Sequence, residues 1–273
     1  MNLTSSQKQR LRELGWDGSI PDFDNKKERD QFFNKTATKL KNRNKERFLK
    51  LLENKVPSWR RVERKLRNIF YELGFVEVQT PSIISPSLLE KMDIGEESKL
   101  YNQIYQIKGE KKSLRPMLAP NLYRELRYFS RISDEEVIRL FELGSCFRKE
   151  NGGERHLNEF KMLNAVEMGN IKDTKKRLDE LISNVFSPFA NYKVEKEKST
   201  VYEETVDVNI KNTEVASCVI GPHFLDSNWH IDEPWVGLGI GVERLTRVIE
   251  GEPSVKPFGK SYVYQDGIRL DIE

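Results

Sequence analysis

The 273-residue chain has a formal net charge of +3, and 33% of its residues are charged, which is typical of a globular protein rather than a membrane-spanning or fibrous one. No apolar run is long enough to cross a bilayer, and residues 1–6 lack the apolar core of a signal peptide. The two cysteines, Cys146 and Cys218, form no C-x-x-C pair, so neither a zinc site nor a disulfide framework is expected. These features predict a cytoplasmic protein with reduced, packed cysteines.

Basic side chains are concentrated in the first quarter of the chain. Residues 26–67 hold 16 Lys and Arg against 5 Asp and Glu, a local charge of +11 that leaves −8 for the remainder. This asymmetry suggests that a polyanion binds along one side of the molecule. The alternative is a solvated helix surface, which is what most runs of charge form.

The N-terminal third has helical patterns. We expect helices at 5–14, at 26–55 and, after the break at Pro57, from a capping Ser58 to residue 73. We therefore divide the chain into a basic helical region, 1–57, and a larger domain, 58–273.

After residue 74 the hydrophobic period changes to two, which is typical of strands. Strands are expected at 75–79, 100–107, 114–118, 138–148, 159–168, 201–210, 214–220 and 235–241. Helices are expected at 86–93, 120–131, 172–187 and after residue 241. Consecutive hairpins with helices outside them predict an α+β domain in which helices flank an antiparallel β-sheet.

Three alternating glycines, Gly237, Gly239 and Gly241, lie in the last of these strands. Side chains alternate between faces in a strand, so one face here is bare and a flat ligand could lie on the backbone. Arg244 follows in the next helix, where a guanidinium can stack on a ring or bind a phosphate. The dinucleotide-binding pattern G-x-G-x-x-G does not fit, because Val242 stands where its third glycine belongs. The alternative is that the glycines let another part of the protein pack closely against the strand, or form a bulge, without any ligand.

A strand–loop–strand segment upstream carries a second candidate site. Arg148 ends one strand beside a polar loop, where it can hold a phosphate with two hydrogen bonds. An exposed hairpin with ordinary surface charges is the alternative. In the next strand Asn164 shares a face with four apolar residues, and a buried amide needs hydrogen-bond partners. Asn164 therefore either bonds the backbone or faces a ligand pocket.

Together these segments resemble the three signature motifs of class II aminoacyl-tRNA synthetases, in their usual order. The helix and strand that end at Pro81 resemble the first motif, Arg148 and Glu150 the second, and the glycine strand with Glu243 and Arg244 the third. The fold that this resemblance implies is the class II catalytic domain with a helical N-terminal extension.

Five segments are more specifically similar to the pyrrolysyl-tRNA synthetase family, at 114–123, 156–160, 162–164, 201–202 and 234–235. The resemblance covers roughly residues 58–273. Longer members of that family have a separate N-terminal tRNA-binding domain. The chain resembles the short form that lacks it.

For ATP, the resemblance implies a phosphate end and an adenine end. Arg148 and Arg244 would be the catalytic arginines, with Arg148 on the α-phosphate. Glu150 and the 151–156 loop would cover the nucleotide, with His156 near the outer phosphates. The adenine would lie between Phe160 and Arg244, over Gly239 and Gly241.

Glu214 and Ser217 are the Mg²⁺ ligands that the resemblance implies, and Mg²⁺ prefers oxygen ligands and substrate phosphates. Residues three apart in a regular strand face opposite ways. Both can contact one metal ion only through a β-bulge or a water molecule.

The resemblance also implies an amino-acid pocket that is large, apolar and nearly uncharged. Its residues would be Met117, Ala119, Leu122, Tyr123, Leu126, Asn164, Val166, Tyr202, Val219, Trp235 and Gly237. Such a pocket suits pyrrolysine, an Nε-acylated lysine, because free lysine would bury an unpaired ammonium. Asn164 would donate to the side-chain amide carbonyl, and Tyr202 would be a mobile lid. Ala165 and Val166 replace the Phe-Cys of longer members, which leaves the preferred acyl group open.

The partners implied are tRNA(Pyl) and a second copy of the chain. The basic residues Lys39, Lys41, Arg43 and Lys45 are the candidates for tRNA contacts, and the segment before Pro81 would form a two-fold dimer. No membrane or DNA partner is expected.

Two other functions stay open from the sequence. A class II synthetase for another amino acid, such as a phenylalanine-like one, is disfavoured by Asn164 and Tyr202. An inactive synthetase paralogue that binds RNA is disfavoured because Arg148, Glu150, Glu214 and Arg244 are all present.

Overall fold

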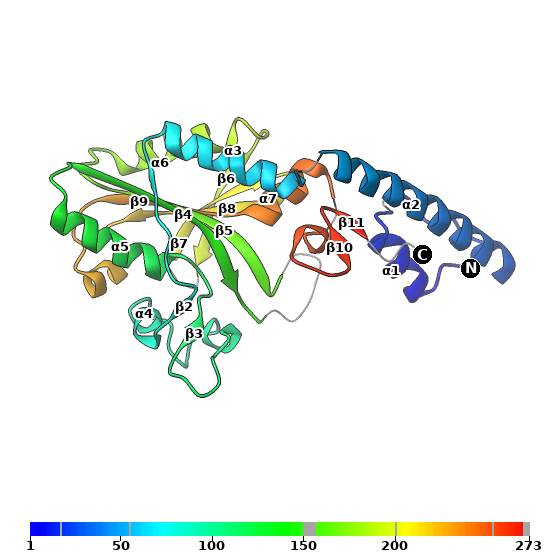
Figure 1. Ribbon diagram of the computed structural model, residues 1–273, viewed down its shortest axis with the longest axis horizontal. Helices are drawn as coiled ribbons and strands as arrows, with labels where there is room; N and C mark the ends of the chain where they lie inside the picture. The colour runs from blue at the N-terminus through cyan, green and yellow to red at the C-terminus, as the bar shows by residue number, and fades with distance from the viewer. Residues whose placement is uncertain (17, 55, 150–156, 200, 253, 270–273) are drawn as a thin grey trace.

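The computed structural model describes all residues except 17, 55, 150–156, 200, 253 and 270–273. Figure 1 shows a body built on one large sheet and an arm of two helices that extends from it. Among the described residues, no helix is both long and apolar enough to cross a membrane.

A seven-stranded sheet forms the centre of the body, in the order β1-β4-β5-β9-β8-β7-β6. From one edge to the other, its strands are β1 Val76–Glu77, β4 Val137–Phe147, β5 Glu159–Gly169, β9 Trp235–Gly241, β8 Thr213–Gly221, β7 Glu203–Ile210 and β6 Lys193–Ser199. β1 runs parallel to β4, and the other neighbours are antiparallel. The predicted α+β fold with helices around an antiparallel sheet is confirmed.

Helices cover one face of this sheet and form the larger core. They are α3 Ser58–Glu72, α6 Thr174–Phe186 and α7 Val242–Glu250, which Figure 1 shows together above the strands. Phe70, Leu181 and Leu245 are fully buried there against the strand residues Leu163 and Ile240. Val62, Leu66 and Phe70 of α3, spaced four residues apart, are buried on the side that packs here.

Shorter elements cover the other face. They are β2 Ile83–Ile84, α4 Pro86–Glu90, the 3₁₀ turn η1 Tyr101–Gln103, β3 Ser113–Leu114, α5 Ala119–Ile132 and the 3₁₀ turn η2 Phe224–Trp229. A second core joins them to the sheet through residues such as Ile104, Leu126 and Trp229. This face carries the candidate site.

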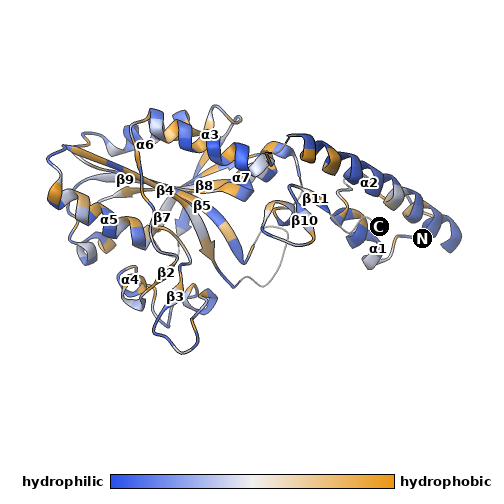
Figure 2. Cartoon of the chain, viewed as in Figure 1, coloured by the Kyte–Doolittle hydropathy of each residue, from blue (hydrophilic) through white to orange (hydrophobic). Residues whose placement is uncertain are grey.

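The arm consists of α1 Ser5–Glu13 and α2 Lys26–Asn54. It has its own small core around Leu11, Leu14 and Leu40. Figure 2 shows that α2 is largely hydrophilic along its length. The 3₁₀ turn η3 Lys256–Phe258 and the hairpin β10 Tyr264–Gln265 and β11 Ile268–Arg269 lie between arm and body (Figure 1). The domain boundary at residue 57 stays a prediction.

Several predicted elements were wrong. The strand expected at 100–107 is a 3₁₀ turn followed by a short hairpin, because Leu100 and Ile104 are buried in the second core instead of lying along a sheet. The strand expected at 114–118 is reduced to β3. β6 was missed, because this edge strand carries charges on both faces and has no apolar period.

The cap of α3 also differs from the prediction. Pro57 is the N-cap residue and Ser58 is the first helical residue. The Ser58 nitrogen donates to both carboxylate oxygens of Asp266, at 2.8 and 2.9 Å. A residue 208 positions away therefore supplies the cap, which no local pattern can show.

Candidate functional site

A cavity of about 570 Å³ opens on the face of the sheet that carries α5. It gathers every predicted ATP and amino-acid residue within the described part of the chain. These are Met117, Ala119, Leu122, Tyr123, Leu126, Arg148, Phe160, Asn164, Val166, Tyr202, Glu214, Ser217, Val219, Trp235, Gly237, Gly239, Gly241 and Arg244. The other two, Glu150 and His156, lie outside the described residues. The roles of all these residues stay predictions.

The floor of the cavity is the glycine strand β9. Gly239 is paired with Asn164 on β5 and with Ser217 on β8, so both side chains border a position that has none. A Cβ atom added at Gly239 or Gly241 would meet its nearest neighbour at 3.4 or 3.5 Å, an ordinary contact. Internal packing therefore does not require glycine at these positions. The bare strand is left available to a ligand.

A β-bulge brings the two predicted Mg²⁺ ligands to the same cavity. Val208 of β7 pairs with Ala216, but the next residue, Asn209, pairs with Glu214, so Val215 is an extra residue in β8. The bulge reverses the alternation, and Glu214 and Ser217 both line the cavity. The geometric difficulty raised by their spacing is thereby removed.

The oxygen donors at this end fit a magnesium ion that also binds substrate phosphates. They are a carboxylate from Glu214 and a hydroxyl from Ser217, with Asp207 lining the same cavity opposite Ser217. Within the described ranges, no three His, Cys, Asp or Glu side chains gather as a metal site.

Two arginines bring positive charge to this end of the cavity, which we call the cationic end after them. The Nε atom of Arg148 donates to the Pro116 carbonyl at 2.8 Å, and its guanidinium lies 5.3 Å from the centre of the Phe160 ring. Arg244 contacts the Glu214 carboxylate at 2.8 Å. Both guanidinium groups are thus oriented by the protein beside the predicted phosphate positions.

Glu243, next to Arg244, is a buried carboxylate that lines the same cavity. It accepts hydrogen bonds from the Lys161 backbone nitrogen, at 3.0 Å to each oxygen. Burial raises the pKa of Glu243 to about 7, against the lowering effect of these bonds.

The other end of the cavity is apolar and closed by aromatic rings. Tyr123 and Trp235 meet edge to face with their ring centres 5.8 Å apart, and Tyr202 lies 6.5 Å from Trp235. The backbone oxygen of Tyr202 is 2.8 Å from His223 Nε2. Burial raises the pKa of the Tyr202 phenol. The predicted lid residue therefore lies inside the pocket.

Asn164 faces the cavity, which resolves the choice that the sequence left open. Its Oδ1 atom is buried and has no hydrogen-bond partner among the described residues. A buried polar atom without a partner costs roughly 1–3 kcal/mol. The amide is consequently placed to gain from a polar ligand group.

The sequence reasoning missed Asp226, which lies behind the aromatic wall and is 2% exposed. Its carboxylate accepts from the Tyr123 hydroxyl at 2.9 Å, from Trp235 Nε1 at 2.7 Å and from the His223 backbone nitrogen at 2.6 Å. The signal was indirect: a buried Tyr and a buried Trp each need an acceptor.

The four candidate tRNA-binding residues lie on α2, away from the cavity. Lys39, Arg43 and Lys45 are exposed, and Lys41 is half-buried. Arg43 also holds α1, because its Nη2 donates to the carbonyl of Gly15 at 2.7 Å.

Comparisons with known proteins agree on the class. A family model described as the phenylalanyl tRNA synthetase beta chain CLM domain matches residues 49–226. The chain is 34% identical over 97 residues to a threonine–tRNA ligase of Treponema pallidum (strain Nichols), which is 35% of this chain and 16% of that protein. It is 25% identical over 185 residues to an aspartate–tRNA(Asp/Asn) ligase of Methanococcus aeolicus, which is 66% of this chain and 38% of that protein. The chain thus spans well under half the length of these relatives, and it belongs to the class II aminoacyl-tRNA synthetases.

Two solved structures specify the family. One is a pyrrolysyl-tRNA synthetase from Desulfitobacterium hafniense, 42% identical, with a TM-score of 0.90 and coverage of 99% of this chain and 98% of that one. The second is also a pyrrolysyl-tRNA synthetase structure from Desulfitobacterium hafniense. It is 42% identical, with a TM-score of 0.88 and coverage of 98% of this chain and 97% of that one. The chain belongs to the pyrrolysyl-tRNA synthetase family, and the predicted resemblance is confirmed.

Proposed function

We propose that this enzyme activates pyrrolysine with ATP and transfers it to tRNA(Pyl). The observation that carries the proposal is one cavity with a cationic end over a bare glycine floor and an apolar end bordered by Asn164. An adenylate needs both ends joined, because the amino-acid carboxylate must meet the α-phosphate.

In the first step the carboxylate attacks the α-phosphorus, the new P–O bond forms, and pyrophosphate leaves. The carboxylate is already ionised at pH 7, so no protein base is needed. Arg148 and Arg244 would neutralise the charge that develops on the phosphate oxygens. Mg²⁺, held by Glu214 and Ser217, would add charge neutralisation at the phosphates. In the second step the terminal ribose hydroxyl of the tRNA takes the aminoacyl group and AMP leaves.

Selection of the amino acid would follow from the apolar end. The ammonium of free lysine would be buried there without a carboxylate partner, which is strongly unfavourable. An acylated, neutral side chain avoids this cost, and Asn164 would bind its amide carbonyl. Tyr202 would close over the bound side chain.

The proposed partners follow from two surfaces. tRNA(Pyl) would bind along α2 through Lys39, Lys41, Arg43 and Lys45. A two-fold homodimer would form at α3 and β1, where Tyr71 and Val76 are half exposed. The cytoplasm is the proposed location, and no membrane or DNA partner is proposed.

A pyrophosphate-exchange screen over amino acids tests the function. Exchange is expected with pyrrolysine and other Nε-acylated lysines, but not with lysine or phenylalanine. Exchange that depends on phenylalanine would contradict the assignment of pyrrolysine as the substrate. Binding of tRNA with no exchange for any amino acid would indicate the inactive paralogue.

A further inference from the structure

The two walls of the proposed adenine site come from different elements. Phe160 lies on β5 and Arg244 on α7, and both line the cavity. A flat ring stacks between them only if β5 and α7 keep a defined spacing. Their chain neighbours, Lys161 and Glu243, are hydrogen-bonded to each other. The backbone nitrogen of Lys161 donates to both carboxylate oxygens of Glu243, at 3.0 Å each. One backbone contact therefore joins the two walls.

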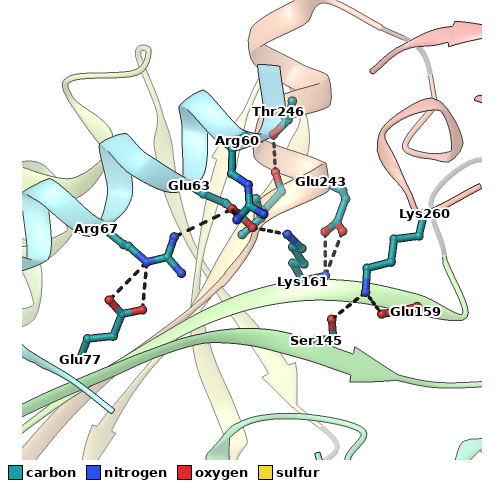
Figure 3. Close-up of polar contacts among 11 residues, drawn as sticks. Arg60, Glu63, Arg67, Glu77, Ser145, Glu159, Lys161, Glu243, Thr246 and Lys260 are labelled. Carbon is teal, nitrogen blue, oxygen red and sulfur yellow. Dashed lines mark hydrogen bonds and ion pairs between the residues drawn. The ribbon is translucent and has the colours of Figure 1, made fainter. Parts of the chain in front are cut away.

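The side chain of Lys161 connects the same strand to a third element (Figure 3). Its Nζ atom lies 2.6 Å from Glu63 Oε1 on α3 and 3.9 Å from the centre of the Trp59 ring. The Glu63 side chain is fully buried, with 0% exposure. An ammonium between a buried carboxylate and an indole face is held in place by both contacts.

Glu63 has further cationic neighbours, which makes the role of Lys161 separable from folding. Arg60 Nη1 lies 2.7 Å and Arg67 Nη1 4.0 Å from its Oε2 atom. The Lys161 side chain is 15% exposed, against 52% for Arg60 and 28% for Arg67. Without the Lys161 charge, Glu63 would still have a cation at hydrogen-bond distance. The main loss would be the link from α3 to β5.

We propose that Lys161 is a positioning residue for ATP, which anchors the strand of Phe160 to α3 and so sets the spacing of the adenine site. This inference rests on the proposed function, because it assumes that ATP occupies this end of the cavity. Lys161 would act through Phe160 and Glu243 without contacting the nucleotide. If Lys161 had only a structural role, replacing it would lower the stability of the protein and would weaken the binding of ATP and of the amino acid to the same extent.

The test is Lys161→Met, which keeps an apolar chain over Trp59 and removes the charge. Dissociation constants would be measured on the full chain for a non-hydrolysable ATP analogue and for an Nε-acylated lysine. The ATP analogue should bind about ten-fold more weakly, and the amino acid within about two-fold of the parent, because small misplacements mainly affect the group they position. Lys161→Arg, which keeps the charge, should restore most of the ATP affinity.

The matched control is Lys175→Met, which removes the lysine of an exposed ion pair with Asp179 on α6 and should change neither constant. Unchanged ATP affinity in folded Lys161→Met, or equal loss for both ligands, would overturn the inference. If Lys161→Met does not fold, Glu63→Gln should produce the same ATP-selective loss, and an unselective result there would also overturn it. Failure of the parent to bind the ATP analogue would instead reject the proposed function.

Discussion

The two ends of the cavity are held in place by different kinds of contact. At the cationic end Arg244 and Glu214 form an ion pair whose side chains are 33% and 45% exposed. At the apolar end Tyr123 and Trp235 are fixed by the buried carboxylate of Asp226. Exposed ion pairs contribute little and exchange partners readily, whereas buried charged groups are costly to disturb.

The difference bears on how the proposed site would serve two ligands. The apolar end, where we propose that the amino acid binds, is shaped before binding, which favours selection among similar side chains. At the cationic end, where we propose that ATP binds, Arg244 would exchange the Glu214 carboxylate for a phosphate, and Glu214 would become available to a cation. Five sets of substitutions test whether the two ends of the cavity act separately.

The largest effect is expected from Arg148→Ala. Losing a guanidinium at the reacting phosphate should reduce pyrophosphate exchange on the order of a thousand-fold, with little change in amino-acid binding. Arg131→Ala, at an exposed position near the end of α5, is the control. Near-normal exchange in Arg148→Ala would remove its phosphate role.

Asp226→Asn should affect the opposite end. An amide has one accepting oxygen in place of two, so one of the donors of Tyr123, Trp235 and the His223 backbone loses its acceptor. We expect a loss of about 2 kcal/mol in unfolding free energy and a matching loss in amino-acid affinity. Denaturant titration and ligand titration measure the two. The exposed Asp232→Asn serves as control, and weaker ATP binding in Asp226→Asn alone would contradict the division of the cavity.

Asn164→Ala should relax the choice of amino acid. Binding of an Nε-acylated lysine should weaken about ten-fold, since one hydrogen bond to the ligand amide is lost, while ATP binding stays unchanged. Michaelis constants for both substrates in the exchange assay provide the measurement. Equal losses for both would count against the amide contact.

The buried Glu243 predicts a pH dependence of stability at the cationic end. Its pKa is raised from 4.5 to about 7 mainly by burial, with the Lys161 backbone and charge lowering it and Glu63 raising it. The folded state therefore binds this proton more tightly than the unfolded state, a stabilisation that is complete below pH 4.5 and is lost as the pH rises through about 7. Glu243→Gln should reduce the loss of unfolding free energy between pH 4.5 and about 7 by on the order of 1 kcal/mol. Denaturant titration at each pH measures this loss. If the unfolding free energies of the parent and of Glu243→Gln changed with pH in the same way, Glu243 would not be the source of the pH dependence.

The smallest effect is expected on the arm, outside the cavity. Replacing Lys39 and Lys45 with Gln should lower the salt dependence of tRNA binding, by roughly one unit of slope for each phosphate that is no longer neutralised. Arg43 is kept, because it holds α1. Binding measured across a salt series should show a shallower slope with unchanged pyrophosphate exchange. An unaltered slope would mean that α2 is a solvated surface.

Much of the site could be predicted because its residues lie in regular strands with clear patterns. The glycine strand was predicted at 235–241 and is found as Trp235–Gly241. The strand face that Asn164 shares with its apolar neighbours was also predicted, since strand alternation is a local property.

Features that depend on distant partners could not be predicted. The bulge at Val215 depends on the register with β7, and Asp226 is explained only by the donors of Tyr123 and Trp235. Glu63 is a charged residue on a helix, and the partner of its Oε1 atom, the Lys161 ammonium, lies 98 positions away in the sequence. No local pattern contains these pairings.

The identity of the amino acid on tRNA(Pyl) can be read from the mass of the aminoacyl-adenosine that a nuclease releases from it. The tRNA would be incubated with the enzyme, ATP, the standard amino acids and pyrrolysine together. We predict that the adenosine carries pyrrolysine. A phenylalanyl adduct, or uncharged tRNA only, would contradict it.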